Sequence, residues 1–227
     1  MSRFTNEDCL ALMRRYPDKY FSLAIVDPPY FDGPQKRKYY GRSISTTKIK
    51  RREYHISPKD YWIPPTEEYF KELFRVSKHQ IIWGCNYFDY LFPGSGRIIW
   101  DKCNGKSSFS DCEIAYCSLH NSVRLFRFMW NGMMQGKSMN EGHIMQGNKN
   151  LNEIRIHPTQ KPVALYEWLL SRYAHPGDII LDTHVGSGSS LIACEQQKFD
   201  YVGCEIDPFY FVAASERIKK YNNGGNE

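Results

Sequence analysis

The sequence predicts an α/β protein in which a mostly parallel sheet has helices on both of its faces. Short apolar runs of strand length alternate along the chain with segments of helical periodicity, which is the pattern of parallel strands joined by helices. The runs are almost continuously apolar, as in Phe21–Val26, and strands buried on both faces have this composition. With 227 residues, of which 41% are hydrophobic, the chain can bury one sizeable core. We therefore expect a single domain over residues 1–227.

The first half of the chain provides most of the predicted sheet. A helix is predicted over Asn6–Arg15, and the buried strand Phe21–Val26 follows it and ends where two prolines forbid further ladder pairing. Thr66 is the expected N-cap of a helix that runs to Val76. Three more strands follow, and the alternating pattern of the last places it near the sheet edge; they span 80–84, 97–100 and 113–118.

The second half begins with a segment of a different character. Residues 119–156 have no sustained period and contain four glycines, so we expect an irregular insert. Regular elements return after Pro162, where Leu165, Trp168 and Leu169 share one face of a predicted helix. A strand, a helix, a strand and a last helix complete the alternation, at 178–182, 190–197, 201–205 and about 209–221.

Composition excludes several classes of protein. The formal net charge is +5, from 30 Lys and Arg against 25 Asp and Glu. No run of about 18 apolar residues is present, which excludes a transmembrane helix, and the first residues lack the apolar core of a signal peptide. The seven cysteines include no Cys-x-x-Cys pair, which predicts free thiols in a reducing compartment and no metal. We therefore expect a cytoplasmic protein that needs no membrane.

Basic residues are concentrated in residues 34–59, which we call the basic loop. It contains nine basic residues and one acidic residue, a net charge of +8, while the rest of the chain carries −3. Tyr39, Tyr40, Tyr54 and His55 lie among these charges. Cations pair with phosphates and aromatic rings stack on bases, so the mixture favours nucleic-acid binding; a solvated surface loop is the alternative. The predicted contact residues are Lys36, Arg37, Lys38, Arg42, Lys48, Lys50, Arg51 and Arg52.

Residues 178–205 combine a strand, a glycine turn, a helix and a second strand. The first strand ends at Asp182, the turn 186–188 reads Gly-Ser-Gly, and the second strand ends at Glu205. Glycines let the backbone approach a cofactor closely, and an acid about twenty residues further on can accept hydrogen bonds from ribose hydroxyls. Leu191 and Ile192 stand where the phosphate-binding form has its third glycine. The pattern therefore favours an adenosine-type cofactor without a pyrophosphate.

The tetrapeptide Asp27-Pro28-Pro29-Tyr30 follows the first buried strand, and ligands bind at the carboxyl ends of strands in open α/β sheets. It matches motif IV of the S-adenosylmethionine-dependent DNA amino-methyltransferases. The run 157–162 resembles their motif X, residues 181–188 resemble motif I, and residues 203–210 resemble motif II. The order IV, X, I is that of the β-class, which contains adenine enzymes and some cytosine 4-amino enzymes. The resemblance covers nearly the whole chain and implies a circularly permuted, Rossmann-like methyltransferase fold.

The resemblance also implies an activity, namely transfer of a methyl group to the 6-amino group of adenine in double-stranded DNA. The Asp27 carboxylate and the Pro28 carbonyl would accept hydrogen bonds from the amine, Pro29 would help to fix that carbonyl, and Tyr30 would stack on the extruded base. A cytosine 4-amino enzyme is the alternative within the class, although that subfamily more often has Ser in place of Asp27. A catalytically weak nucleic-acid-binding subunit is the alternative from another class, against which the complete tetrapeptide argues.

For the cofactor, the resemblance implies S-adenosylmethionine held by three parts of the chain. Glu205 would bind the ribose hydroxyls, and Thr159 and Lys161 would approach the methionine carboxylate. Asp8 would lie near the adenine end, with helix capping as an equally good interpretation. The motif I residues around the methionine part would be Asp182, Gly186, Ser187 and Gly188.

Two features depart from the usual family pattern. Thr183-His184 stands where the family usually has Pro-Phe after the aspartate, which bears on cofactor affinity; we assign His184 no role in proton transfer. The insert 119–156 falls where β-class enzymes carry target recognition, has a net charge of +3 and contributes Arg124 and Arg127 as predicted DNA contacts. Its shortness suggests a short or relaxed recognition sequence, with a surface excursion as the alternative. Together with the basic loop it would form two walls of a DNA cleft.

Partners beyond DNA stay open at this point. A homodimer and a cognate restriction enzyme both fit the resemblance, as does an orphan phage methylase without a restriction partner.

Overall fold

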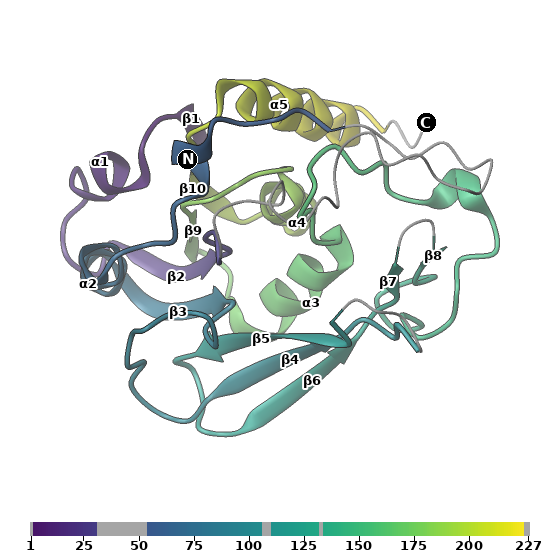
Figure 1. Cartoon of the computed structure of the whole chain (residues 1–227), viewed down its shortest axis with the longest axis horizontal. Coiled ribbons are helices and arrows are strands. Elements are labelled where there is room, and N and C mark those ends of the chain that lie inside the picture. Colours follow the sequence, from purple (N-terminus) through teal and green to yellow (C-terminus); the bar gives the residue numbers. More distant parts are fainter. Residues whose placement is uncertain (1, 31–53, 106–109, 132–133, 225–227) are drawn as a thin grey trace.

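A mixed sheet of eight strands organises the chain, in the order β1-β10-β9-β2-β3-β5-β4-β6 (Figure 1). The computed structural model describes residues 2–30, 54–105, 110–131 and 134–224. The strands of the sheet are β1 (Arg3–Asn6), β2 (Phe21–Val26), β3 (Ser77–Trp83), β4 (Arg97–Asp101), β5 (Cys112–Cys117), β6 (Val123–Arg127), β9 (Ile179–Asp182) and β10 (Asp200–Glu205). A small two-stranded sheet pairs β7 (Trp130–Asn131) with β8 (Met134–Gln135).

The sheet is mostly parallel, as the sequence predicts. β1, β10, β9, β2 and β3 pair in parallel, whereas β5 runs antiparallel to both β3 and β4, and β4 pairs in parallel with β6. The carboxyl ends of seven strands therefore meet at one edge of the sheet. The amino end of β5 reaches the same edge, because that strand runs the other way.

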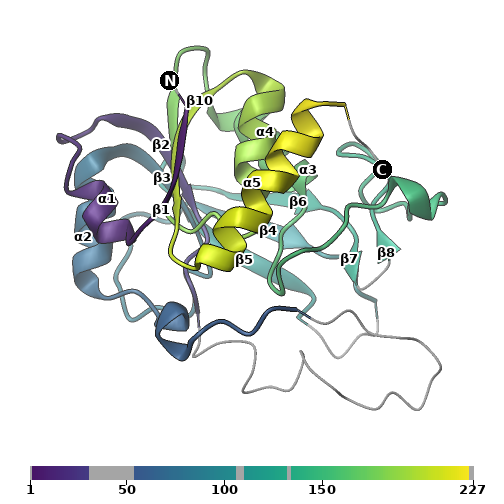
Figure 2. The same cartoon turned by 90° about the horizontal axis from the view of Figure 1, so that it is seen from above.

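Helices cover both faces of the sheet (Figures 1 and 2). The alternation of side chains along β2 shows why: Leu23 and Ile25 belong to one apolar core, and Ala24 and Val26 belong to the other. The helices α3 (Val163–Tyr173), α4 (Ser189–Gln197) and α5 (Pro208–Asn222) close the first core, while α1 (Cys9–Met13) and α2 (Glu67–Val76) close the second. Two short 3-10 helices, η2 (Lys59–Trp62) and η3 (Lys149–Leu151), lie outside this framework.

The first element differs from the prediction of one helix over Asn6–Arg15. Residues 3–6 form β1, where Asn6 pairs with Glu205, and the helix is only α1. Asp8 caps α1 by accepting a hydrogen bond from the Ala11 N–H at 3.0 Å, so the capping interpretation of Asp8 is confirmed. Thr66 stands at the N-cap of α2 but makes no side-chain capping hydrogen bond.

The prediction was also wrong about the edge of the sheet. β5 lies between β3 and β4, and the edge strand beyond β4 is β6, which falls inside the segment expected to be irregular. Only Phe126 of β6 is buried, while Val123 and Leu125 are 62% and 57% exposed. β6 is held in place by backbone pairing with β4 and by the one buried ring of Phe126. Its sequence therefore lacks the periodicity from which a strand could be predicted.

Candidate active site

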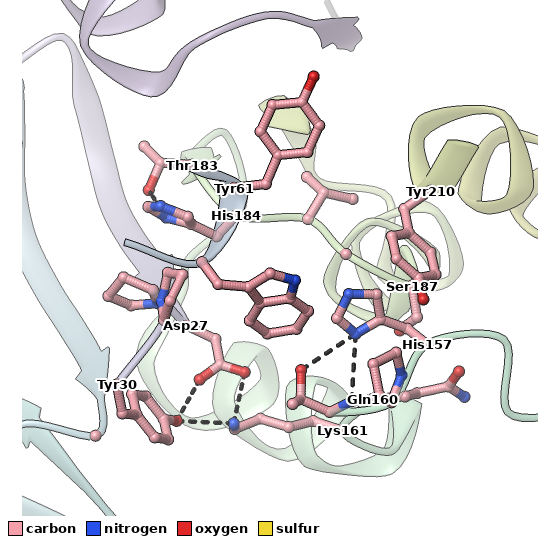
Figure 3. A pocket seen from close by; sticks show the side chains of 18 of the residues that line it. Asp27, Tyr30, Tyr61, His157, Gln160, Lys161, Thr183, His184, Ser187 and Tyr210 are labelled. Carbon is pink, nitrogen blue, oxygen red and sulfur yellow. Dashed lines mark hydrogen bonds and ion pairs between the residues drawn. The ribbon is translucent and has the colours of Figure 1, made fainter. Parts of the chain in front are cut away.

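A cavity of about 1190 Å³ lies at the carboxyl edge of the sheet and collects most of the predicted site residues (Figure 3). All four predicted catalytic residues line it, from Asp27 to Tyr30. The predicted cofactor residues that also line it are Asp8, Thr159, Lys161, Gly186, Ser187 and Glu205. Asp182 and Gly188 are not among the lining residues. The cavity thus joins the end of β2 to the turn between β9 and α4.

Asp27 follows the last residue of β2 and points into the cavity (Figure 3). Its Oδ1 accepts a short hydrogen bond from the Tyr30 hydroxyl, and its Oδ2 lies 2.5 Å from the Lys161 Nζ. Burial raises the pKa of this carboxyl, and the Lys161 ammonium opposes that effect. Asp27 is therefore a carboxylate held between two donors at the floor of the cavity.

Tyr30 is packed as well as hydrogen-bonded. The Tyr87 ring stacks on one face of the Tyr30 ring, with centroids 5.2 Å apart and planes 9° from parallel. Gly84 lies against the same ring, because a Cβ at Gly84 would come within 2.1 Å of a Tyr30 ring carbon, and its φ of +70° also favours glycine.

Lys161 lies between Asp27 and the glycine turn. Its side chain is only 4% exposed, and its ammonium contacts Asp27, Glu113 at 2.8 Å and the Tyr30 hydroxyl at 3.0 Å. Its backbone carbonyl accepts the hydroxyl of Ser189, which follows the glycine turn, at 2.8 Å. Glu113 also pairs with Lys102, and neither of these two residues was predicted to belong to the site.

The glycine turn is held by two buried carboxyls. Asp182 accepts the His184 N–H at 3.0 Å and a short hydrogen bond from the Ser190 hydroxyl, so it fixes the turn from behind. Glu205 accepts the N–H of Gly186 at 2.8 Å and that of Asp207 at 2.9 Å. Burial raises the pKa of each carboxyl to about 7.

Thr183 and His184, the unusual pair in motif I, are tied into the second core. The Thr183 Oγ1 lies 2.6 Å from the Tyr69 hydroxyl and 2.9 Å from the His184 Nδ1. The His184 ring packs edge-on against Tyr69, and burial lowers the pKa of His184 to about 4. His184 therefore lines the cavity as a neutral, packed ring.

Residues of the segment 54–66 also line the cavity, a role that no sequence pattern indicated. The Ser57 hydroxyl donates to the Asp207 carboxylate, and the Tyr210 hydroxyl donates to the His55 carbonyl at 2.9 Å. Trp62 stacks on His157, with ring centroids 5.6 Å apart. Burial lowers the pKa of His157 to about 3, so this motif X histidine is a neutral part of the wall.

The predicted DNA-binding residues are only partly placed. The eight basic residues of the loop from Lys36 to Arg52 lie outside the described residues. Arg127 ends β6 at the cavity edge of the sheet and pairs with Asp101 at 3.0 Å. Arg124 is exposed further back on β6, opposite Ile98. Within the insert, Lys137 pairs with Glu141.

In the described parts of the chain, no group of three or more His, Cys, Asp or Glu side chains could hold a metal ion. Within the same ranges, no helix is long and apolar enough to cross a membrane.

Several known proteins are similar to this chain. The sequence profile of the DNA methylase family, the N6/N4 methyltransferases, matches residues 126–216. Type II methyltransferase M.HpaI of Haemophilus parainfluenzae is 24% identical over 258 residues, which cover 98% of this chain and 76% of that protein.

Two solved structures have a similar fold. The complex of M1.HpyAVI with SAM has a TM-score of 0.58 at 19% identity, over 96% of this chain and all of that one. The PvuII DNA methyltransferase, described as cytosine-N4-specific, has a TM-score of 0.55 at 14% identity, over 97% and 90% of the two chains. The predicted resemblance is thereby confirmed: this chain has a Rossmann-like methyltransferase fold and is similar over nearly its whole length to the S-adenosylmethionine-dependent DNA methyltransferases.

Proposed function

We propose that this protein transfers a methyl group from S-adenosylmethionine to the 6-amino group of an adenine extruded from double-stranded DNA. One observation carries the proposal: the same cavity is lined by Asp27–Tyr30, which would accept hydrogen bonds from the amine, and by the glycine turn together with Glu205. A methyl donor held at the turn and an amine held at Asp27 would share that cavity. The matches to DNA methylases support the same class of reaction.

The residues around the turn fit an adenosine-type cofactor. Each Glu205 oxygen accepts one backbone N–H, and a carboxylate oxygen can accept a second donor such as a ribose hydroxyl. Trp62, Ile206 and Tyr210 line the cavity nearby and provide apolar surface for a purine. When bound there, S-adenosylmethionine would supply an electrophilic methyl group, and its sulfur would keep the electron pair of the broken bond.

Asp27 is suited to act on the amine. The lone pair of an aromatic amine is delocalised into the ring, so an acceptor that draws on its N–H favours a tetrahedral, nucleophilic nitrogen. The Asp27 carboxylate faces the cavity, already oriented by Tyr30 and Lys161. We further propose that the Pro28 carbonyl is the second acceptor and that Tyr30 stacks on the base.

The test is transfer of tritium from labelled S-adenosylmethionine to unmethylated DNA. We expect label transfer by the wild type and a loss of about 100-fold or more in Asp27→Ala, because one oriented electrostatic partner typically contributes that much to catalysis. Asp18→Ala is the matched control, since the Asp18 side chain is 76% exposed and pairs with Arg75 away from the cavity. Cofactor binding without transfer to any DNA would instead support the catalytically weak subunit.

Cytosine 4-amino methylation is the second candidate, favoured by the similar fold of the cytosine-N4-specific PvuII enzyme. Digestion of the labelled DNA to nucleosides separates the two: methyladenosine supports our choice and methylcytidine overturns it. Long-read sequencing of DNA from expressing cells would give the modified base and the recognition sequence together.

A further inference from the structure

A chain of alternating charges lies at the floor of the cavity. Lys102 pairs with one oxygen of Glu113, the other Glu113 oxygen lies 2.8 Å from the Lys161 Nζ, and Lys161 lies 2.5 Å from Asp27. The exposed fractions of these side chains are 17% for Lys102, 20% for Glu113, 4% for Lys161 and 15% for Asp27. Charges this far from water interact strongly, so each of them affects the next.

The Lys161 ammonium has three oxygen neighbours in this arrangement. Its Nζ donates to the Asp27 carboxylate and to the Tyr30 hydroxyl, and it forms an ion pair with Glu113 at 2.8 Å. It also lies 5.4 Å from the centroid of the Tyr30 ring and 5.6 Å from that of the Trp83 ring. The single positive charge of Lys161 is therefore divided between two carboxylates, one of which is the amine acceptor of the proposed function.

We propose that Glu113 is a positioning residue for methyl transfer, which acts through Lys161 to keep Asp27 a strong acceptor for the target amine. The proposal rests on the proposed function, because it concerns the same amine. Glu113 comes from β5, which runs antiparallel, so its carboxylate reaches the catalytic edge from the amino end of its strand.

The physical argument compares the chain of charges with and without Glu113. As the amine nitrogen forms its new bond to carbon, it gains positive charge and its N–H becomes more acidic, so a more basic acceptor stabilises the transition state more. With Glu113 ionised, Lys161 is shared and Asp27 keeps much of its negative charge for the amine. Without that charge, Lys161 would pair with Asp27 alone, and Asp27 would become a weaker acceptor.

Groups on several elements face Asp27 and set its protonation. Glu113 is a negative neighbour, Lys161 is the adjacent cation, and Lys102 acts through Glu113. Tyr30 and Tyr166 are neutral, and Asp182 keeps its proton below its raised pKa of about 7. Burial raises the pKa of Asp27, Lys161 lowers it, and Glu113 raises it. Removing the charge of Glu113 should therefore lower the pKa of Asp27.

The experiment is the pH dependence of the single-turnover methylation rate at saturating DNA and S-adenosylmethionine, for wild type, Glu113→Gln and Glu68→Gln. In Glu113→Gln we expect a plateau about three- to tenfold lower, together with an acid limb moved to lower pH by about half a unit or more. Affinities for cofactor and DNA should stay within about twofold. Glu68→Gln is the matched control, because the Glu68 side chain is 58% exposed and pairs with Arg14, the C-cap residue of α1.

The paired changes distinguish positioning from a merely structural role, since damage to the fold would lower the plateau without moving the acid limb. An acid limb that stays in place in Glu113→Gln, or that moves to higher pH, overturns the proposal. If Glu113→Gln does not fold, Lys102→Met decides. In Lys102→Met, Glu113 would pair with Lys161 only, and Lys161 would then stabilise the Asp27 carboxylate less. The acid limb should therefore move to higher pH, and an acid limb that stays in place overturns the proposal. No transfer by the wild type would instead count against the proposed function itself.

Discussion

Single buried carboxyls at strand ends connect the site to the stability of the fold. Asp182 ends β9, is 2% exposed and has both oxygens occupied, by the His184 N–H and the Ser190 hydroxyl. Burial nevertheless raises its pKa from an ordinary value of 3.8 to about 7. Between these two values the unfolded chain has released the proton while the native protein retains it. Unfolding therefore becomes easier as the pH rises through this range.

This sign leads to a prediction for Asp182→Asn, which keeps an acceptor for His184 but cannot ionise. Between pH 5 and pH 8 the free energy of unfolding should fall by about 2–3 kcal/mol more in the wild type than in the variant. Denaturant unfolding at the two pH values measures this difference. Asp18→Asn serves as the exposed control and should follow the wild type. Parallel pH dependences for wild type and Asp182→Asn would show that Asp182 ionises normally in the native protein.

At the scale of elements, one buried ion pair ties the last helix to the glycine turn and to the insert. Arg217 of α5 is 8% exposed and lies 2.7 Å from Glu153, and its other nitrogen donates to the Ser187 carbonyl at 2.8 Å. Glu153 in turn accepts the N–H of Val163, the first residue of α3, at 2.9 Å. Glu153 therefore belongs to the scaffold, although its charge counts in the net charge of the insert.

Because Arg217 is the partner of a buried carboxylate, Arg217→Met should lower the free energy of unfolding by about 3–5 kcal/mol. The double variant Arg217→Met with Glu153→Gln should recover part of that loss, since no uncompensated charge remains and Gln still accepts the Val163 N–H. Urea denaturation of the four members of this cycle provides the measurement. A double variant as unstable as the sum of the two single variants would argue that the pair acts through packing alone.

How closely the sequence predicts a strand depends on how many apolar side chains that strand buries. β2 and β9 were predicted closely because they lie in the middle of the sheet and are almost continuously apolar. β6 was missed because it is an edge strand and buries little. The motif residues were predicted to meet at the carboxyl edge, and most of them line one cavity there.

The site residues that the sequence did not reveal share one property. Glu113, Lys102 and Trp62 reach the cavity through long-range packing, on an antiparallel strand and in connecting segments. No local spacing marks such residues. Lys161 was recognised, but its contacts with Asp27 and Glu113 join residues from distant parts of the chain and do not follow from its motif.

At the scale of the whole molecule, charge is distributed unevenly around the cavity. The net charge of +5 contains +8 from the basic loop alone. Residues 31–53, which include most of the loop, lie outside the described residues. The described residues on either side of them, Tyr30 and Tyr54, both line the cavity. The chain therefore enters and leaves this loop at the proposed catalytic site. The phosphates on either side of an extruded base would lie close to that site. Arg127 at the end of β6 marks the same edge of the sheet.

We therefore predict that the loop contributes phosphate contacts, and that exchanging Lys50, Arg51 and Arg52 for Gln weakens DNA binding and flattens its salt dependence. Each lost phosphate contact should reduce the slope of log K against log[salt] by about 0.9, so the triple variant should lose between about 2 and 3 in slope. Binding to a duplex of fixed sequence at several salt concentrations measures this. Lys71, Lys78 and Lys219, changed together to Gln, form a control of equal charge on exposed positions that do not line the cavity. If both triple variants keep the wild-type slope, the basic loop is solvated surface, and DNA must be held by other residues around the cavity.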